Sequence, residues 1–141
     1  MCLRGASEIQ TKVLEQIKND DLRIYTVYLP ILQNDQESSV PSALKSLPDT
    51  RVRFYWDGKG ILAKDYAPVL QLPEGQPAWD LYLAFPRQAE WKDAPPTPDF
   101  WMHQLRSQSL TRRLDGTKFA EETKRLLQAG KKEPSRTKEE E

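Results

Sequence analysis

The segment LRIYTVYL, residues 22–29, combines aliphatic, β-branched and aromatic side chains and contains no glycine or proline. This composition favours a β-strand that is mostly buried. Two further segments have the same character, RVRFYW at residues 51–56 and AWDLYLAF at residues 78–85. Turn-forming residues follow the first two segments: Pro30 after the first, and the sequence DGKG at residues 57–60 after the second. The sequence therefore predicts three strands.

Helical spacing of apolar residues marks the segments around these strands. The predicted helices are residues 7–18, 39–47 and 61–70, a segment that opens at Phe100 with Thr97 or Asp99 as its cap, and residues 117–127. Helices that alternate with strands predict an α/β fold, in which helices cover a parallel or mixed sheet. Such a sheet usually begins with a strand, whereas this order begins with a helix. We therefore expect the first core strand to be missing.

Length, composition and charge restrict the class of protein. A chain of 141 residues with 38% hydrophobic and 30% charged residues predicts one water-soluble domain. Glu8, Gln10 and Lys12 interrupt any signal-peptide core, and no apolar run is long enough for a membrane span, so the chain as written is expected to be cytoplasmic and not bound to a membrane. The 21 basic and 21 acidic residues balance, which argues against a nucleic-acid partner.

The single cysteine and the single histidine limit the chemistry available to the chain. One cysteine excludes an internal disulfide and a cysteine-based metal cluster, so no metal or other cofactor is expected. His103 lies among aromatic residues, and we interpret it as a packed, hydrogen-bonded histidine. The dipeptides Trp56-Asp57 and Trp79-Asp80 are interpreted as strand ends with turn-forming aspartates; a carboxylate pair at one sheet edge is the functional alternative.

Cys2 stands at the predicted start of the first helix, where the helix dipole and unpaired N–H groups favour a thiolate, and Arg4 adds a positive charge. Three interpretations are open. The thiol is incidental to a chain terminus; or it is the remnant of a degenerate or truncated redox site; or the start codon is misplaced, with a cysteine or selenocysteine codon upstream. The upstream DNA distinguishes the third interpretation from the others.

Several segments carry a resemblance to a known family. They are CLRGA at residues 2–6, VYLPIL at 27–32, RVRFYWDG at 51–58, AWDLYLAF at 78–85 and PDFWMHQL at 98–105. Over about residues 1–105 the chain resembles the thioredoxin-like superfamily, in particular poorly characterised bacterial thioredoxin-like proteins, with an apparent truncation at the N-terminus. The resemblance implies a thioredoxin-like mixed sheet that is flanked by helices and lacks its first core strand.

The resemblance also implies a redox site. In that family a Cys-x-x-Cys pair caps the first long helix, and Cys2 matches the second, resolving cysteine. The nucleophile would lie three positions upstream of Cys2, before Met1. Pro77 is the nearest match to the family's cis-proline. The implied partners are protein thiols or disulfides, and with one cysteine we expect little dithiol activity from this chain.

The predicted organisation is a thioredoxin-like domain over residues 1–110, a C-terminal helix over 111–129 and a disordered charged tail over 130–141. The sheet edge left by the absent strand favours formation of a homo-oligomer. The alternative function is a non-catalytic interaction module that uses an aromatic and proline-rich surface around Trp91, residues 94–98 and Trp101.

Overall fold

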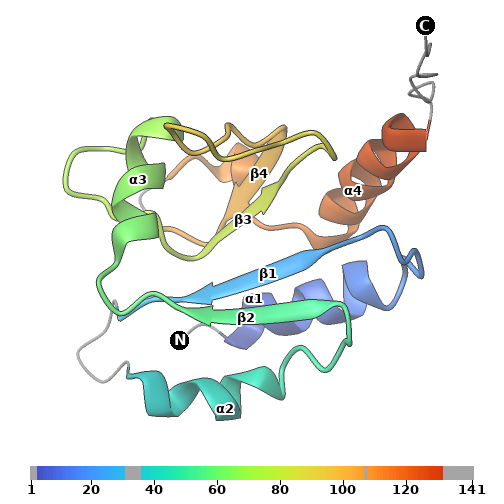
Figure 1. Cartoon of the computed structure of the whole chain (residues 1–141), viewed down its shortest axis with the longest axis horizontal. Coiled ribbons are helices and arrows are strands. Elements are labelled where there is room, and N and C mark those ends of the chain that lie inside the picture. Colours follow the sequence, from blue (N-terminus) through green and yellow to red (C-terminus); the bar gives the residue numbers. More distant parts are fainter. Residues whose placement is uncertain (1–2, 31–35, 107, 132–141) are drawn as a thin grey trace, which may run out of the picture.

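The computed structural model describes residues 3–30, 36–106 and 108–131, and its elements alternate between helix and strand (Figure 1). In chain order they are α1 (Leu3–Ile9), the π-helical segment η1 (Gln10–Leu14), β1 (Ile24–Tyr28), the 3-10 turn η2 (Glu37–Ser39), α2 (Val40–Leu44), β2 (Val52–Trp56), α3 (Ile61–Val69), β3 (Leu81–Ala84), β4 (Phe100–His103), the 3-10 turn η3 (Leu110–Arg112) and α4 (Gly116–Lys131). The chain is therefore a mixed α/β protein, as its sequence predicts.

The four strands form two separate two-stranded sheets rather than the single sheet that the sequence predicts. β1 and β2 pair in parallel, with Ile24 opposite Val52. β3 and β4 pair in an antiparallel arrangement, with Leu81 opposite His103. Both kinds of pairing are present, but no strand of the described residues joins β1 to β3. Figure 1 shows β1 between β2 and the β3–β4 pair.

The largest correction concerns residues 100–103, which form strand β4 and not the start of a helix. Neither proposed cap acts as one. The backbone N–H of Asp99 donates to the Ala84 carbonyl at 2.9 Å, which leads the chain into the β3–β4 ladder, and the Asp99 carboxylate forms an ion pair with Arg125 of α4. Apolar side chains then alternate between the two sides of the strand, Phe100 against one core and Trp101 against the other. This period of two belongs to a strand that is covered on both faces.

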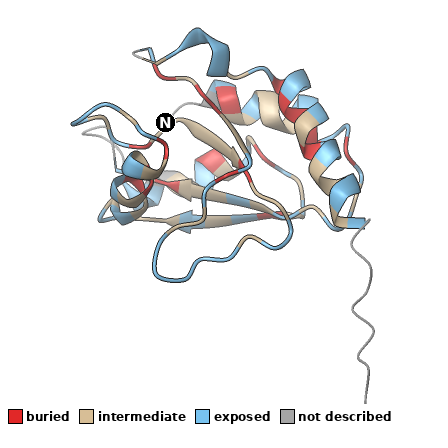
Figure 2. Cartoon of the chain, turned by 90° about the horizontal axis from the view of Figure 1, so that it is seen from above, coloured by how far each residue is buried: buried red, intermediate tan, exposed pale blue. Residues whose placement is uncertain are grey.

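The other predicted helices are present with shifted bounds. The first begins at Leu3 and continues as η1, and three apolar residues of the predicted range 7–18, Val13, Leu14 and Ile17, are at most 5% exposed. The last helix includes Gly130 and Lys131, which the sequence assigns to the charged tail; residues 132–141 lie outside the described residues. Figure 2 shows buried and exposed positions within the same helices, as expected for helices that lie against a core on one side.

Two apolar cores hold the layers together. The first core joins η1 and α4 to both sheets; its buried members are Val13, Leu14, Ile17, Leu47, Val52, Ala84, Met102, Phe119 and Ala120. The second core lies between α3 and the other face of the β3–β4 sheet; its buried members are Tyr66, Leu70 and Ala78, with Leu81, Leu83 and Trp101 packed against them. The β3–β4 sheet is thus covered on both faces.

The turn after β2 positions α3. Gly60 N–H donates to the Asp57 carbonyl at 3.1 Å, and Gly60 adopts a φ of 64°, a conformation that glycine tolerates without a side-chain clash. The Asp57 carboxylate accepts the Leu62 N–H at 2.8 Å and so binds a free donor of the first turn of α3. This confirms Asp57 as a turn-forming aspartate at a strand end.

Candidate functional site

The candidate site is the first turn of α1 together with the polar groups that it contacts. Cys2 itself lies outside the described residues, and α1 begins at the next residue, Leu3. Gly5 in that turn packs so closely on β3 that a side chain there would overlap the Tyr82 hydroxyl. A Cβ atom at residue 5 would also lie 2.6 Å from Gln104 Oε1. The absence of a side chain at Gly5 therefore lets α1 approach the β3–β4 hairpin.

Tyr82 and Gln104 connect this turn to the residue that precedes β3. The Tyr82 hydroxyl donates to Gln104 Oε1 at 3.3 Å. The Gln104 backbone N–H donates to the Asp80 carbonyl at 3.0 Å. Gly5, Tyr82, Gln104 and Asp80 consequently form one contiguous group of contacts, built from three segments that are far apart in the sequence.

Asp80 is the titratable member of this group. Its φ of 50° lies in the left-handed region, where residues other than glycine are uncommon, although Asp and Asn occur there more often than most. The side chain is half-buried, and burial raises the pKa of its carboxyl group because the charged form loses hydration. A strained residue with a perturbed carboxyl group is typical of functional positions. The sequence analysis placed Asp80 only at a strand end, as one of two Trp-Asp dipeptides.

Pro77 lies in the loop between α3 and β3, three residues before Asp80, and it is exposed. The described residues contain no cis peptide bond, so the bond before Pro77 is trans, in contrast to the cis-proline that the family resemblance implies. The Pro77 carbonyl accepts the Trp79 N–H at 3.1 Å, and the Ala78 N–H donates to the Ala63 carbonyl of α3 at 3.3 Å. These bonds fix the loop in which Pro77 and Asp80 lie.

His103 is fully buried, with no exposed surface. Its Nε2–H donates to the Ser109 carbonyl at 2.8 Å, and its Nδ1 accepts the Leu105 N–H at 3.0 Å. Both ring nitrogens are thus used by the backbone, which assigns the proton to Nε2. The interpretation of His103 as a packed, hydrogen-bonded histidine is confirmed.

A second polar group surrounds Arg51, which directly precedes β2. Its guanidinium donates to the carbonyls of Leu14 at 2.8 Å, Ile17 at 2.6 Å and Asn19 at 3.1 Å. It also binds both carboxylate oxygens of Asp49, at 2.8 and 3.0 Å. This hydrogen bonding holds the pKa of Asp49 at about 2, below its usual 3.8. Arg51 therefore satisfies the carbonyl of the last residue of η1 and two carbonyls of the loop that follows it, a structural role that the sequence pattern does not indicate.

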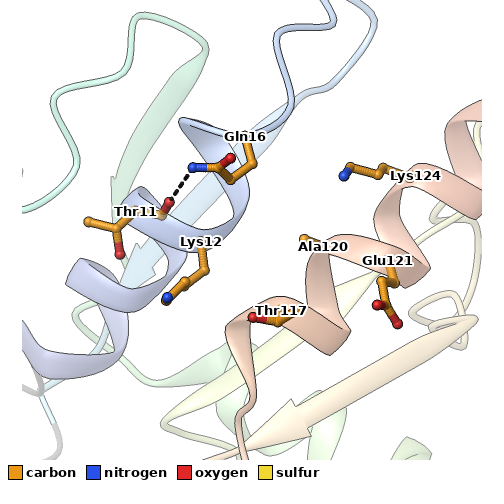
Figure 3. A pocket seen from close by; sticks show the side chains of 7 residues that line it. All are labelled: Thr11, Lys12, Gln16, Thr117, Ala120, Glu121 and Lys124. Carbon is orange, nitrogen blue, oxygen red and sulfur yellow. Dashed lines mark hydrogen bonds between the residues drawn. The ribbon is translucent and has the colours of Figure 1, made fainter.

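A surface hollow of about 520 Å³ lies between the first helical segment and α4 (Figure 3). Its lining residues are Thr11, Lys12, Gln16, Thr117, Ala120, Glu121 and Lys124, of which all but Ala120 are exposed. Figure 3 shows Gln16, in the turn after η1, donating to the Thr11 carbonyl; the distance is 3.3 Å. Because these polar side chains are solvated and come from two helix surfaces, we place the candidate site at Asp80 and not in this groove.

Over the described residues, no group of three or more His, Cys, Asp or Glu side chains is placed to hold a metal ion. Within the same residues, none of the helices combines the length and apolar character that a membrane span requires. Comparison with known proteins finds no matching family model, no matching curated protein and no matching solved structure.

Proposed function

We propose that this chain is a thioredoxin-like protein of the thiol-disulfide redox lineage, with an incomplete dithiol site and little dithiol activity in its present form. The observation that carries the proposal is the arrangement around α1. The helix that follows Cys2 in the sequence contacts β3 through Gly5 and Tyr82. Asp80, the residue directly before β3, has a carboxyl group whose pKa is raised by burial.

The layers support a thioredoxin-like sheet that lacks its first core strand. α4 and η1 pack on one face of the β3–β4 sheet, and α3 packs on the other. A parallel pair, β1–β2, and an antiparallel pair, β3–β4, share the first core without bonding to each other. A first core strand that paired with both sheets would unite them into a single mixed sheet.

The chemistry available to Cys2 is the first half of a thiol-disulfide exchange. The Cys2 thiolate attacks one sulfur of a substrate disulfide, a mixed disulfide forms, and the other substrate sulfur leaves as a thiolate. With no second cysteine in the chain, the mixed disulfide is released only by an external thiol. In this proposal Cys2 holds the resolving position and Asp80 is the group that holds or accepts a proton.

Two assays test the proposal. Insulin reduction with dithiothreitol as electron donor should show no turnover above the reductant alone, whereas incubation with glutathione disulfide should give a single adduct on Cys2 by intact mass. Cys2→Ser should abolish the adduct. The pH profile of adduct formation should change in Asp80→Asn and remain unchanged in Asp93→Asn, since Asp93 is exposed.

Sustained insulin reduction that Cys2→Ser abolishes would contradict the incomplete site. An unaltered pH profile in Asp80→Asn would remove Asp80 from the site. An adduct rate equal to that of the free peptide MCLRGA would leave Cys2 an incidental thiol.

The exposed aromatic residues favour the second candidate function, a non-catalytic interaction module. Part of the aromatic and proline-rich surface is already in use: Tyr66 donates to the Pro96 carbonyl at 3.3 Å and packs edge-on against Trp91 at 5.9 Å between ring centroids. Trp91 nevertheless remains 46% exposed. If the chain is an interaction module, the Cys2→Ser variant should bind the partner as tightly as the native chain, and the Trp91→Ala variant should bind it more weakly. A redox role predicts that Cys2→Ser, and not Trp91→Ala, removes the activity.

A further inference from the structure

The outer face of the β1–β2 sheet carries a pair of exposed tyrosines. Ile24 and Phe54 pack against the first core, so the residues that alternate with them lie on the opposite face of the sheet. These outer positions are Arg23, Tyr25, Val27, Arg53 and Tyr55. Tyr25 and Tyr55 are 64% and 53% exposed, and their ring centroids are 6.3 Å apart. The two rings therefore form one contiguous aromatic surface that is open to solvent.

An uncovered face is unusual for a sheet of this kind. β1 and β2 pair in parallel, and parallel sheets normally have both faces covered, because the connections between their strands pack on the sheet. The first core covers the inner face of this sheet. The exposure of Tyr25 and Tyr55 shows that none of the described segments covers their rings. Contiguous exposed apolar surface of this type is typical of a binding surface.

The charged groups of the outer face are cationic. Arg53 is the register partner of Tyr25, and Arg23 precedes β1 in phase with Tyr25. None of the five outer positions is a Lys, Asp or Glu. Asp57, the next residue in phase on β2, uses its carboxylate within the first turn of α3. Arg53 donates to nearby backbone carbonyls through Nη1, and among the described residues its Nε and Nη2 groups have no acceptor. The guanidinium of Arg53 can therefore bind an anionic group beside the rings.

Composition and charge together define the class of partner. Tyr and Arg are enriched at the centres of protein–protein interfaces, where Lys, Asp and Glu are depleted. The outer face has this composition although 30% of the chain is charged. A nucleic-acid surface needs a larger cluster of cations, and a second copy of the same face would bring like charges together. Carboxylates of a partner protein complement the two guanidinium groups without either disadvantage.

We propose that the outer face of the β1–β2 sheet is a docking surface for an acidic segment of a partner protein. An apolar or aromatic side chain of that segment packs on Tyr25 and Tyr55, and flanking carboxylates bind Arg23 and Arg53. The docking surface includes no residue of the aromatic and proline-rich surface around Trp91. The proposal goes beyond the redox chemistry and does not depend on Cys2.

Selection from a display library of random ten-residue peptides, with the full native chain as the target, tests the proposal. The selected peptides should be acidic and should contain at least one apolar or aromatic residue between the acidic ones. A selected peptide should bind saturably and shift the backbone amide signals of Tyr25, Val27, Arg53 and Tyr55 in NMR spectra. The same peptide with Asn and Gln in place of Asp and Glu should bind at least tenfold more weakly.

Substitutions on the face separate the contributions of rings and charge. Tyr25→Ser and Tyr55→Ser should each weaken binding of the selected peptide at least tenfold. Arg53→Gln should weaken it at least fivefold and reduce its dependence on salt. Trp91→Ala is the control for an exposed ring elsewhere, and Arg87→Gln is the control for an exposed cation elsewhere; both should bind as the native chain does. Urea denaturation of each variant reports whether it is folded, and the exposed positions should change stability little.

Several results would overturn the docking surface: selection that yields no saturable binder, selected peptides that are neutral or basic, or equal binding by Tyr25→Ser. Tighter binding of a ten-residue oligothymidine to the same residues would assign the face to nucleic acid instead. Concentration-dependent dimerisation in light scattering, abolished by Tyr55→Ser, would assign it to a second copy of the chain.

Discussion

The two sheets are packed very differently. The β3–β4 sheet lies between two cores, so that Met102 is 1% exposed on one side while Trp101 packs against α3 residues on the other. The β1–β2 sheet shares only the first core, and its outer face carries Tyr25 and Tyr55 at 64% and 53% exposure. One half of the molecule is thus a three-layer structure and the other half is a two-layer structure. The exposed pair Tyr25 and Tyr55 belongs to the two-layer half, whereas the aromatic and proline-rich surface around Trp91 packs on Tyr66 of α3 in the three-layer half.

The largest effect is expected from the three-layer half. Met102→Ala should lower the free energy of unfolding by about 2–4 kcal/mol, because it removes a fully buried side chain and leaves a cavity between the sheet and α4. Tyr55→Ala on the two-layer half should cost about 1 kcal/mol or less, since it removes a mostly exposed ring and its contact with Tyr25. Urea denaturation of the two variants at one pH measures both values.

Equal losses of unfolding free energy in Met102→Ala and Tyr55→Ala would contradict the difference in packing between the two halves. Such a result would mean that something covers the outer face of the β1–β2 sheet in solution. The concentration dependence of the Tyr55→Ala loss would then show whether a second copy of the chain provides the cover.

The two-layer half also depends on polar contacts for its attachment to the helices. Arg51→Ala should lower the free energy of unfolding by roughly 2–3 kcal/mol, because it leaves the carbonyls of Leu14 and Ile17 and the Asp49 carboxylate without their donor. Arg53→Ala, two residues along the chain within β2, is the matched control. Arg53 donates only to the nearby carbonyls of Thr50 and Val52, so its removal should change stability by no more than about 0.5 kcal/mol. A loss from Arg53→Ala as large as that from Arg51→Ala would show that charge on β2, and not the Arg51 contacts, secures the sheet.

The sequence predicts an element well where the residues of that element alone determine its structure, and poorly where the structure depends on pairing with a distant segment. The segments LRIYTVYL and RVRFYW predicted β1 and β2 because β-branched and aromatic side chains favour strands wherever they pack. The sequence predicts a helix that opens at Phe100, with Thr97 or Asp99 as its cap, but a short apolar run such as FWMHQL fits either a helix or a strand that is covered on both faces. Only the pairing with β3, which involves residues about twenty positions earlier, resolves that ambiguity.

The candidate site was less predictable than the fold. Local chemistry and the family resemblance indicate Cys2 and Pro77, whereas Asp80 becomes distinctive only through its burial and its positive φ. The contacts among Gly5, Tyr82 and Gln104 join three distant segments and leave no periodic pattern. The sequence signals available were the Trp79-Asp80 dipeptide at a strand end and a glycine in the first helix; neither one specifies a partner.

The smallest predicted effect is a dependence of stability on acid that is specific to the two-layer half. The Arg51 guanidinium holds the pKa of Asp49 at about 2 in the folded chain, against 3.8 as its usual value. Because the folded pKa is the lower one, this contribution to stability is complete above about pH 4 and is lost as the pH falls toward 2. The difference in unfolding free energy between the native chain and Asp49→Asn should therefore shrink between pH 5 and pH 2, by at most about 2 kcal/mol.

Asp80 should change stability with pH in the opposite direction. Because its pKa is raised in the folded chain, its charged form disfavours folding. Asp80→Asn should accordingly be more stable than the native chain at neutral pH, and that advantage should decrease as the pH falls. Parallel pH profiles for the two variants would show that the carboxyl groups titrate alike, and that Arg51 does not anchor the two-layer half through Asp49.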